Sequence, residues 1–455
     1  MDSGFGIGGH SKSVVEMTTS KLDYWSPFIV EHSVKRSYKT EIRPQSVSGD
    51  GPIEFHLSAD PEKFIDISTL TLHGRVGVRV KDGDGKWIPV SKSSPRSEKW
   101  GVINNFYQSL CSSVTAKVND CEIGDIANNS YPYASYLQTL LGTSASQAAN
   151  HILSERGFIK DKLGEMVAVT PGMCINGPFA QRRKSLLENE FIDFNIPLHN
   201  DLMTVEKYIP PNTKISFTIR KSSDDFLIWK EESDKNEYKI VLEDLHLKVM
   251  LLEVFPQVLK NHQKLQKDGG AIRIKYTQNV LKTFAVPKGS VELKQHNLFF
   301  GNRLPDRVYI TFVEQEAYNG DSKKNPFYFE TVGMKEAALI VNGVSEPSPP
   351  YTFDEGVDEK DLYFNFLENT GTSAFEMDSV NVSLDEFKDG YFILPFDRSP
   401  TKDNGLYTHK SEGGSLTVKV NSKKALDKNY MVMVFGSYDS SLIFVDDKVI
   451  NESIY

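Results

Sequence analysis

Apolar and polar residues alternate over many short stretches of the chain, the pattern of half-buried β-strands. From Thr69 to Lys81, apolar residues at every second position alternate with Thr, His, Arg and Lys. This pattern predicts a long strand with one face in water. Further strands are predicted at 191–196, 214–220, 245–255, 272–284, 308–313, 416–420 and 430–435. Turns recur often and there is no regular β-α-β alternation, so we predict an all-β protein of sandwich or jelly-roll type.

One segment, 104–141, combines strand, turn and helix signals in close succession. Val114–Val118 has strand composition, Asn119-Asp120 predicts a tight turn, and Cys121–Ile123 returns. A helix is expected next, with Pro132 in its first turn, where the missing N–H of proline costs nothing. The apolar face of this helix follows three- and four-residue spacing and comprises Tyr133, Tyr136, Leu137, Leu140 and Leu141.

The same order of elements returns in the second half of the chain. Asn325–Phe329 leads into a strand at Ala337–Val341, and Asn342-Gly343 is the strongest short hairpin signal. Leu362–Leu367 then follows an acidic loop. The sequence therefore predicts one supersecondary unit that occurs twice, once in each half.

The length of the chain favours two domains. A chain of 455 residues is too long for one sandwich and suits two units of about 200 residues each. Lys260–Gly270 is polar, lacks aromatic residues and ends in Gly-Gly near the midpoint, which indicates a boundary. We predict a flexible N-terminal arm at 1–45, a first domain at 46–256, a linker at 257–271 and a second domain at 272–455.

Charge and cysteine content narrow the class of protein. The net charge of −9 argues against strong direct binding of nucleic acid, which requires clustered Lys and Arg. Three cysteines, Cys111, Cys121 and Cys174, do not form a disulfide framework, and a reducing compartment is expected. No apolar run approaches the roughly 20 residues of a membrane span, so none is predicted.

The chain offers few residues for catalysis. Its ten histidines include no His-x-His pair of the kind that holds a metal in a jelly roll. His56 and His73 are candidates to converge across strands, although a lone strand histidine is usually structural. No Gly-x-Ser-x-Gly motif is present, and the cysteines lack a nearby histidine, so they are expected to be buried small side chains. We predict no catalytic, cofactor-binding or metal-binding residue, no cofactor, and no enzymatic activity.

One acidic turn requires a choice between two interpretations. Asp82-Gly83-Asp84-Gly85 supplies two carboxylates that are suitable for calcium. The loop lacks the remaining oxygen ligands and the closing glutamate of a calcium-binding loop. A hairpin turn is therefore the favoured interpretation.

A set of short segments occurs in a fixed order from about residue 50 to the end of the chain. They are Asn105–Asp120, Tyr131–Leu141, Phe191–Trp229, Phe284–Gly289, Asn297–Gly301, Leu304–Val308, Glu316–Gly320 and Lys324–Phe327. This ordered set resembles the major capsid proteins of the polinton (Maverick) and adintovirus group. The resemblance covers most of the chain and leaves out the first 45 residues.

The resemblance implies a double jelly roll, in which two consecutive eight-stranded jelly rolls with short inserted helices stand side by side. It also implies a homotrimer that forms a pseudo-hexameric capsomer of an icosahedral shell. Neighbouring capsomers, penton proteins and minor capsid proteins would be the partners. The expected location is the virion, assembled in the cytoplasm or nucleus of the host cell. Relatives of this group also lie in animal genomes as integrated elements.

Two other functions stay open from the residues alone. A two-domain β-sandwich module that binds glycans or a receptor would show an exposed aromatic platform. A jelly-roll hydrolase or metal oxygenase would show convergent carboxylates or a metal site.

Overall fold

The computed structural model describes most of the chain and leaves out the N-terminal segment and several connections. The described residues are 31–46, 51–92, 99–123, 130–148, 151–167, 169, 176–299, 303–353, 359–370, 380–400, 412–445 and 448–453. Within these ranges the protein consists mainly of β-strands, with short helices inserted between them. The prediction of an all-β protein is therefore confirmed.

Strands from the first half of the chain form two antiparallel five-stranded sheets. One has the order β1-β12-β4-β5 with β9 also paired to β4, the other has the order β2-β3-β10-β7-β8, and β6 pairs separately with β11. The bounds are β1 Val34–Ile42, β2 Pro44–Ser46, β3 Ile53–Leu57, β4 Lys63–Lys81, β5 Trp87–Pro89, β6 Trp100–Val102, β7 Cys111–Val118, β8 Cys121–Ile123, β9 Ile192–Pro197, β10 Ile215–Lys221, β11 Ile228–Lys230 and β12 Tyr238–Val254.

Strands from the second half form a further five-stranded sheet and a four-stranded sheet. Their orders are β13-β20-β15-β18, with β21 paired to β20, and β14-β19-β16-β17. The bounds are β13 Ile272–Val286, β14 Glu292–His296, β15 Arg307–Glu314, β16 Met334–Val341, β17 Val344–Thr352, β18 Leu394–Asp397, β19 Leu416–Ser422, β20 Tyr430–Val445 and β21 Lys448–Ser453.

The two halves have the same strand order. When strands are matched in chain order, β1-β12-β4-β9 corresponds to β13-β20-β15-β18, and β3-β10-β7-β8 corresponds to β14-β19-β16-β17. Two facing four-stranded sheets with these crossovers make an eight-stranded jelly roll. Each half is therefore one roll, and β2, β5, β6, β11 and β21 are additions to this plan.

The repeat extends to the hydrogen bonds of one turn. Asn119 and Asn342 follow equivalent strands, and both have left-handed backbone conformations, with φ of 52° and 50°. The Asn119 side chain accepts a hydrogen bond from the backbone N–H of Lys214 at 2.9 Å, and Asn342 accepts one from Ser415 at 3.0 Å. The backbone N–H of each asparagine donates to the carbonyl of the same partner. The duplicated unit predicted from the sequence is therefore present in both rolls.

The expectation of a flexible arm as far as residue 45 is wrong for its last part. Val34–Ile42 is strand β1, which pairs antiparallel with β12 from Val34 opposite Val254 to Ile42 opposite Leu247. The ladder contains one register shift, between Val34 and Arg36, and Arg36 pairs with Glu253 at 2.6 Å. Residues 1–30 lie outside the described residues. The first roll therefore begins with β1.

Helices are short and lie in the connections between strands. The longest follow β8, precede β9, join the two rolls or follow β17. The bounds are η1 Val90–Lys92, α1 Phe106–Ser109, α2 Ser130–Leu141, α3 Ala145–Ala148, α4 His151–Glu155, α5 Gly177–Glu188, η2 Asp201–Thr204, α6 Asp224–Leu227, α7 Pro256–Lys267, α8 Gln315–Tyr318, α9 Glu359–Asn369 and α10 Leu384–Lys388. Most of the predicted linker 257–271 is therefore the helix α7.

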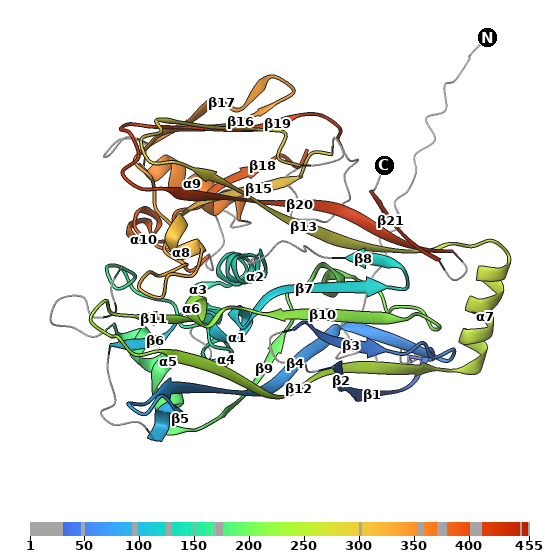
Figure 1. Ribbon diagram of the computed structural model, residues 1–455. Helices are drawn as coiled ribbons and strands as arrows, with labels where there is room; N and C mark the ends of the chain where they lie inside the picture. Colours follow the sequence, from blue (N-terminus) through green and yellow to red (C-terminus); the bar gives the residue numbers. More distant parts are fainter. Residues whose placement is uncertain are drawn as a thin grey trace, which may run out of the picture.

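The four main sheets lie in layers (Figure 1). The sheet containing β1, β12 and β4 is outermost on one side, followed by the sheet containing β3, β10 and β7. The sheet of β13, β20 and β15 comes next, and the sheet of β14, β19, β16 and β17 is outermost on the other side. Helix α2 lies between the two inner layers, and α7 stands at one end of the molecule, where it joins the rolls. The limits of the two rolls as independent domains stay a prediction.

Candidate functional site: the seam between the two rolls

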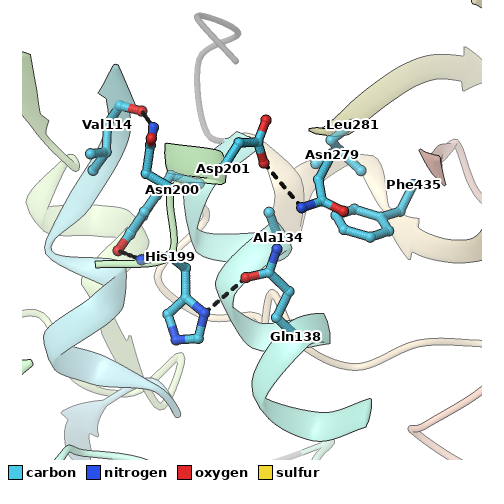
Figure 2. Close-up of a pocket in the computed structure, with 10 residues that line it drawn as sticks. Val114, Ala134, Gln138, His199, Asn200, Asp201, Asn279, Leu281 and Phe435 are labelled. Atoms are coloured by element: carbon cyan, nitrogen blue, oxygen red, sulfur yellow. Dashed lines mark hydrogen bonds between the residues drawn. The ribbon is translucent and has the colours of Figure 1, made fainter. Parts of the chain in front are cut away.

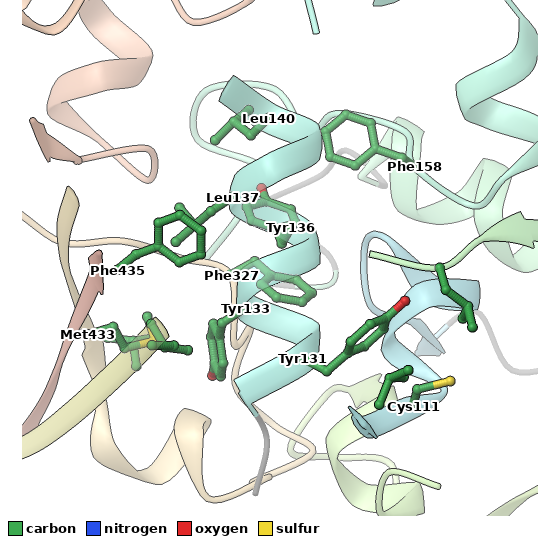
Figure 3. Close-up of a cluster of buried hydrophobic side chains, with 14 of the residues drawn as sticks. Cys111, Tyr131, Tyr133, Tyr136, Leu137, Leu140, Phe158, Phe327, Met433 and Phe435 are labelled. Carbon is green, nitrogen blue, oxygen red and sulfur yellow. The ribbon is translucent and has the colours of Figure 1, made fainter. Parts of the chain in front are cut away.

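Helix α2 is the centre of the contact between the two rolls, which we call the seam. Tyr133, Tyr136, Leu137 and Leu140 are each at most 2% exposed. The predicted apolar face is therefore buried, except that Leu141 at its end is only half-buried. These side chains pack together with residues of both rolls (Figure 3). The opposite side of the helix presents Gln138 toward a small cavity (Figure 2). Helix α2 thus touches other elements around most of its circumference.

Aromatic residues from the second roll pack directly on α2. The Tyr136 ring stacks on Phe327, with ring centroids 4.1 Å apart and planes within 5°. Tyr133 stacks on Tyr318 at 5.4 Å, and Phe329 meets Tyr136 edge to face at 5.8 Å. Aromatic pairs of this kind contribute about 0.5–1.5 kcal/mol each beyond the area they bury. The seam therefore has the composition of a protein core.

A buried ion pair supports the first-roll side of the seam. The Arg182 guanidinium on α5 lies 2.9 Å from the Asp161 carboxylate, and both side chains are at most 2% exposed. Arg182 also donates to the carbonyl oxygens of Ile159 and Val102. Burial raises the pKa of Asp161, and the guanidinium opposes that rise by favouring the charged form. Loss of Arg182 alone would leave a buried charge without its partner.

Polar contacts cross the seam beside the aromatic cluster. The Tyr391 hydroxyl donates to the Asp161 carbonyl at 2.7 Å, and the Lys160 ammonium lies 2.6 Å from the Glu386 carboxylate. The Asn325 side chain donates to the Met166 carbonyl at 3.2 Å. Burial lowers the pKa of Lys160, which Glu386 partly offsets. These contacts fix the two rolls in one relative orientation.

A small polar cavity lies at the seam, between α2 and β13 (Figure 2). Its volume is about 30 Å³, which is enough for on the order of one water molecule. His199 Nδ1 donates to Gln138 at 2.8 Å, and Asn279 donates to Asp201 at 3.0 Å. The polar groups of the cavity are therefore paired with one another, and the space is too small for a substrate.

The structure separates the two histidines that were candidates to converge. His56 lies on β3 and His73 on β4, and these strands belong to different sheets. His73 instead faces His246 across the β4–β12 pair, with stacked rings 5.2 Å apart. The candidate pairing of His56 with His73 is wrong because the two strands enter opposite layers of the first roll.

The environments of two cysteines and of the acidic turn indicate structural rather than chemical roles. Burial raises the pKa of the Cys111 thiol to about 12 and raises that of Cys121, so neither is activated as a nucleophile. Cys174 lies outside the described residues. Asp82 accepts hydrogen bonds from the backbone N–H groups of Asp84 and Lys86, which confirms the hairpin interpretation.

Metal-ligating side chains do not cluster in the part of the chain that the structure describes. In those ranges no three His, Cys, Asp or Glu side chains gather as a metal site. None of the helices there combines the length and the apolar character of a membrane span. The exposed aromatic residues Trp87, Tyr208, Phe255 and Phe364 come from four separate parts of the fold. Among the residues that the structure describes, these four aromatic side chains do not share one strand or helix.

Sequence patterns found only part of the seam. The face of α2 follows from local spacing, and Phe327 belongs to the predicted repeated unit. Asp161 and Arg182 are not predicted, because nothing in their local sequence indicates that two charged side chains become buried together. Asn176, which caps α5 by accepting from Phe179 and is followed by Pro178, was the available signal for the helix that carries Arg182.

Comparison with known sequences gives one distant relative of full length. It is a protein of Caenorhabditis elegans described as uncharacterised, 21% identical over 413 residues, which cover 89% of this chain and 94% of the relative. No protein-family model matches the chain.

Comparison with solved structures finds viral shell proteins. A chain in the cryo-EM structure of the Sputnik virophage matches with a TM-score of 0.60 at 11% identity, over 97% of this chain and 93% of that one. The Faustovirus major capsid protein matches with 0.53 at 8% identity, over 94% and 93%. The mavirus major capsid protein matches with 0.50 at 11% identity, over 100% and 96%. At these identities the likeness defines the fold: the chain is a double jelly-roll protein.

Proposed function

We propose that this chain is a structural virion protein, the major capsid subunit of an icosahedral shell. The observation that carries the proposal is the duplicated roll, built twice with one strand order and fixed by a core-like seam. Solved structures with a similar fold include the mavirus and Faustovirus major capsid proteins. The described ranges hold two rolls packed through a core-like seam and no cluster of metal-ligating side chains. Such a body is suited to assembly, and the proposed role is structural rather than enzymatic.

The way the rolls face each other supports a trimer. The first roll presents its sheet of β3, β10, β7 and β8 to the seam, whereas the second presents β13, β20, β15 and β18 (Figure 1). These two sheets are not equivalent, so the contact is head-to-tail. Head-to-tail contacts generate closed rings when the rotation between units closes. Three chains of two rolls would place six rolls around a ring.

The outer sheets are the surfaces that such a ring would use. The β1-β12-β4-β9 sheet has the same strand order as β13-β20-β15-β18, the sheet that the second roll presents at the seam. Its outer face is therefore the first of the two surfaces. The exposed face of β14-β19-β16-β17 is the counterpart of the first-roll sheet at the seam. Repetition of the seam geometry therefore joins these two outer faces between copies.

We place the chain in the polinton and adintovirus group as part of this proposal. The collinear segments from Asn105–Asp120 to Lys324–Phe327 support the assignment. A full-length relative in an animal is consistent with a group whose members also lie in animal genomes. The proposed partners are neighbouring capsomers, penton proteins and minor capsid proteins, and the proposed location is the virion, with assembly in the host cytoplasm or nucleus.

Size-exclusion chromatography with light scattering tests the trimer. The purified protein is expected at three times the chain mass of 51.3 kDa, because obligate interfaces bury thousands of Å² and are stable at micromolar concentration. A strict monomer at high concentration would overturn the proposal.

Charge reversal on the outer faces locates the contact. Lys239 lies opposite Arg79 on the first-roll sheet, and Lys294 lies opposite Lys419 on the second-roll sheet. Lys239→Glu with Lys294→Glu places opposite charges next to each other within each sheet, which favours folding. The double variant is expected to weaken the trimer at least tenfold. The matched control Lys260→Glu with Lys264→Glu, two reversals on α7, is expected to leave it intact.

A further inference from the structure

Helix α7 is an amphipathic helix without a buried face. None of its residues is buried, although Val258, Leu259 and Leu265 are apolar and Leu265 is 65% exposed. Isolated helices of about a dozen residues are marginal in water, and helices in proteins are held by an apolar face that packs on something else. The described part of the chain gives α7 an aromatic contact in Phe64, whose ring meets His262 at 5.7 Å.

A cleft of about 530 Å³ opens between α7 and the ends of the two rolls. Its walls combine helix residues with prolines and aromatic residues of both rolls: Leu259, Gln263 and Gln266 from α7, and Phe64, Pro210 and Phe444 from the strands and loops that face it. This size lies within the range of sites that hold a bound group, roughly 300–1,000 Å³. The cleft is therefore large enough for side chains of a further segment.

The N-terminal part of the chain enters the described structure beside this cleft. The backbone N–H of Phe255, the residue before α7, donates to the carbonyl of Ser33 at 3.0 Å. Ser33 lies eight positions after Trp25 in the sequence, a span of up to about 27 Å. Helix α7 has 12 residues and is about 18 Å long. The residues just before Ser33 therefore reach any point on the cleft.

The chemistry of that segment matches the cleft. Leu22–Val30 has the sequence Leu-Asp-Tyr-Trp-Ser-Pro-Phe-Ile-Val, with six large apolar or aromatic side chains and one acidic residue, Asp23. Helix α7 carries Lys260, Lys264 and Lys267 and has no acidic residue within Pro256–Lys267. Both the apolar content and the charge are complementary.

We propose that the cleft beneath α7 is the docking site for Leu22–Val30 of the same chain. The segment covers the apolar side of α7, and its aromatic side chains fill the space between the helix and the two rolls. Docking within one chain is favoured because Ser33 is fixed next to the helix, which gives the segment a high effective concentration. The N-terminal segment thus ties the first roll to the connection between the rolls. This proposal does not depend on the capsid function.

Hydrogen exchange measured by mass spectrometry tests the proposal on the full chain. Peptides that cover residues 22–30 are expected to exchange at least tenfold more slowly than an unstructured peptide of the same sequence. Gln263→Glu with Gln266→Glu places two carboxylates on the cleft wall, where they repel Asp23, and is expected to abolish this protection. The matched control, Gln257→Glu with Asn261→Glu, changes α7 at positions that do not line the cleft and is expected to retain it.

Three results would overturn the proposal. In the first case, residues 22–30 of the unaltered chain exchange at the rate of the free peptide. In the second case, both double variants lose protection to the same extent. In the third, protection rises with protein concentration, which would assign the segment to a neighbouring copy.

A chain that lacks residues 1–30 gives an independent measurement. It retains β1 complete, because β1 begins at Val34. Faster exchange of the α7 amides in this chain supports the docking, whereas unchanged exchange of α7 contradicts it.

Discussion

The two rolls share a strand order but differ in the connection that follows the second strand of the repeated hairpin. In the first roll this connection contains α2 to α5, and α2 is buried against the second roll (Figure 3). In the second roll the equivalent connection contains α9 and α10, and Phe364 on α9 is 56% exposed. One strand plan therefore carries two kinds of helix, one that builds the seam and one that leaves an aromatic ring in solvent. The comparison shows that the connections, rather than the strands, make the two rolls different.

The largest loss of stability is expected on substitution of Tyr136 on α2, and the matching substitution on α9 measures the difference between the two helices. Tyr136→Ala removes the ring that stacks on Phe327 and leaves a cavity in the seam, so the free energy of unfolding should fall by about 4 kcal/mol. Phe364→Ala on α9 should change it by less than about 0.5 kcal/mol, since that ring is largely exposed. Denaturant unfolding of both variants measures the contrast, and equal losses would refute it.

The buried ion pair should give the next largest effect. Arg182→Met leaves the buried Asp161 carboxyl without its partner, at a cost of about 3 kcal/mol. Replacing both residues, Arg182→Met with Asp161→Leu, should recover most of that loss because no buried charge remains. The exposed pair of Lys81 with Glu237 is the control, and Lys81→Met should have little effect. If the double variant is as unstable as the single one, the charge is not the cause.

Histidines at the seam and on the outer sheet should differ in their contribution to pH dependence. Burial lowers the pKa of His199 to about 4, so the folded protein binds this proton less readily than the unfolded chain. The contribution of His199 is complete above about pH 6.5 and is lost as the pH falls toward 4. In His199→Gln, the fall in the free energy of unfolding between pH 7.5 and pH 4 should be smaller by on the order of 2 kcal/mol.

His73 provides the outer-sheet comparison. Burial and the nearby Lys248 lower its pKa to about 4 as well, but His73 is partly exposed on the sheet and solvent screens its charge. Unfolding curves of His199→Gln and His73→Gln between pH 7.5 and 4 measure the contrast. If His73→Gln changes the pH dependence of the free energy of unfolding more than His199→Gln does, the contrast is contradicted.

The smallest effect tests what the rolls have in common. Asn119→Ala and Asn342→Ala each place alanine in a left-handed conformation and remove one hydrogen bond to the next strand. Each should cost about 1.5 kcal/mol, and the two costs should agree within about 0.5 kcal/mol. Denaturant unfolding measures both. A large difference would show that the turns are alike in geometry but not in energy.

Local sequence patterns predicted the strands and the repeated turn well. The alternation over Thr69–Lys81 became part of β4, and Asn342-Gly343 became a turn with φ of 50° and 86°. These features depend on neighbours in the chain, whose geometry is set by side-chain period and by the few residues that accept positive φ. The same logic placed the apolar face of α2.

Contacts between distant residues could not be predicted in this way. Tyr136 and Phe327 are far apart in sequence, and either ring would fit many apolar surroundings. β1 was assigned to the arm because its partner β12 lies at the other end of the first roll, and only pairing with β12 makes it a strand. Asp161 and Arg182 are ordinary surface residue types until the fold buries both. The seam is therefore a property of the fold that the local sequence does not reveal.

Electron microscopy of the purified protein tests the central claim most directly. The account predicts particles with six lobes around a threefold axis, because each of three chains contributes two rolls joined head-to-tail. Class averages that show only isolated two-lobed particles, at concentrations well above micromolar, would contradict it.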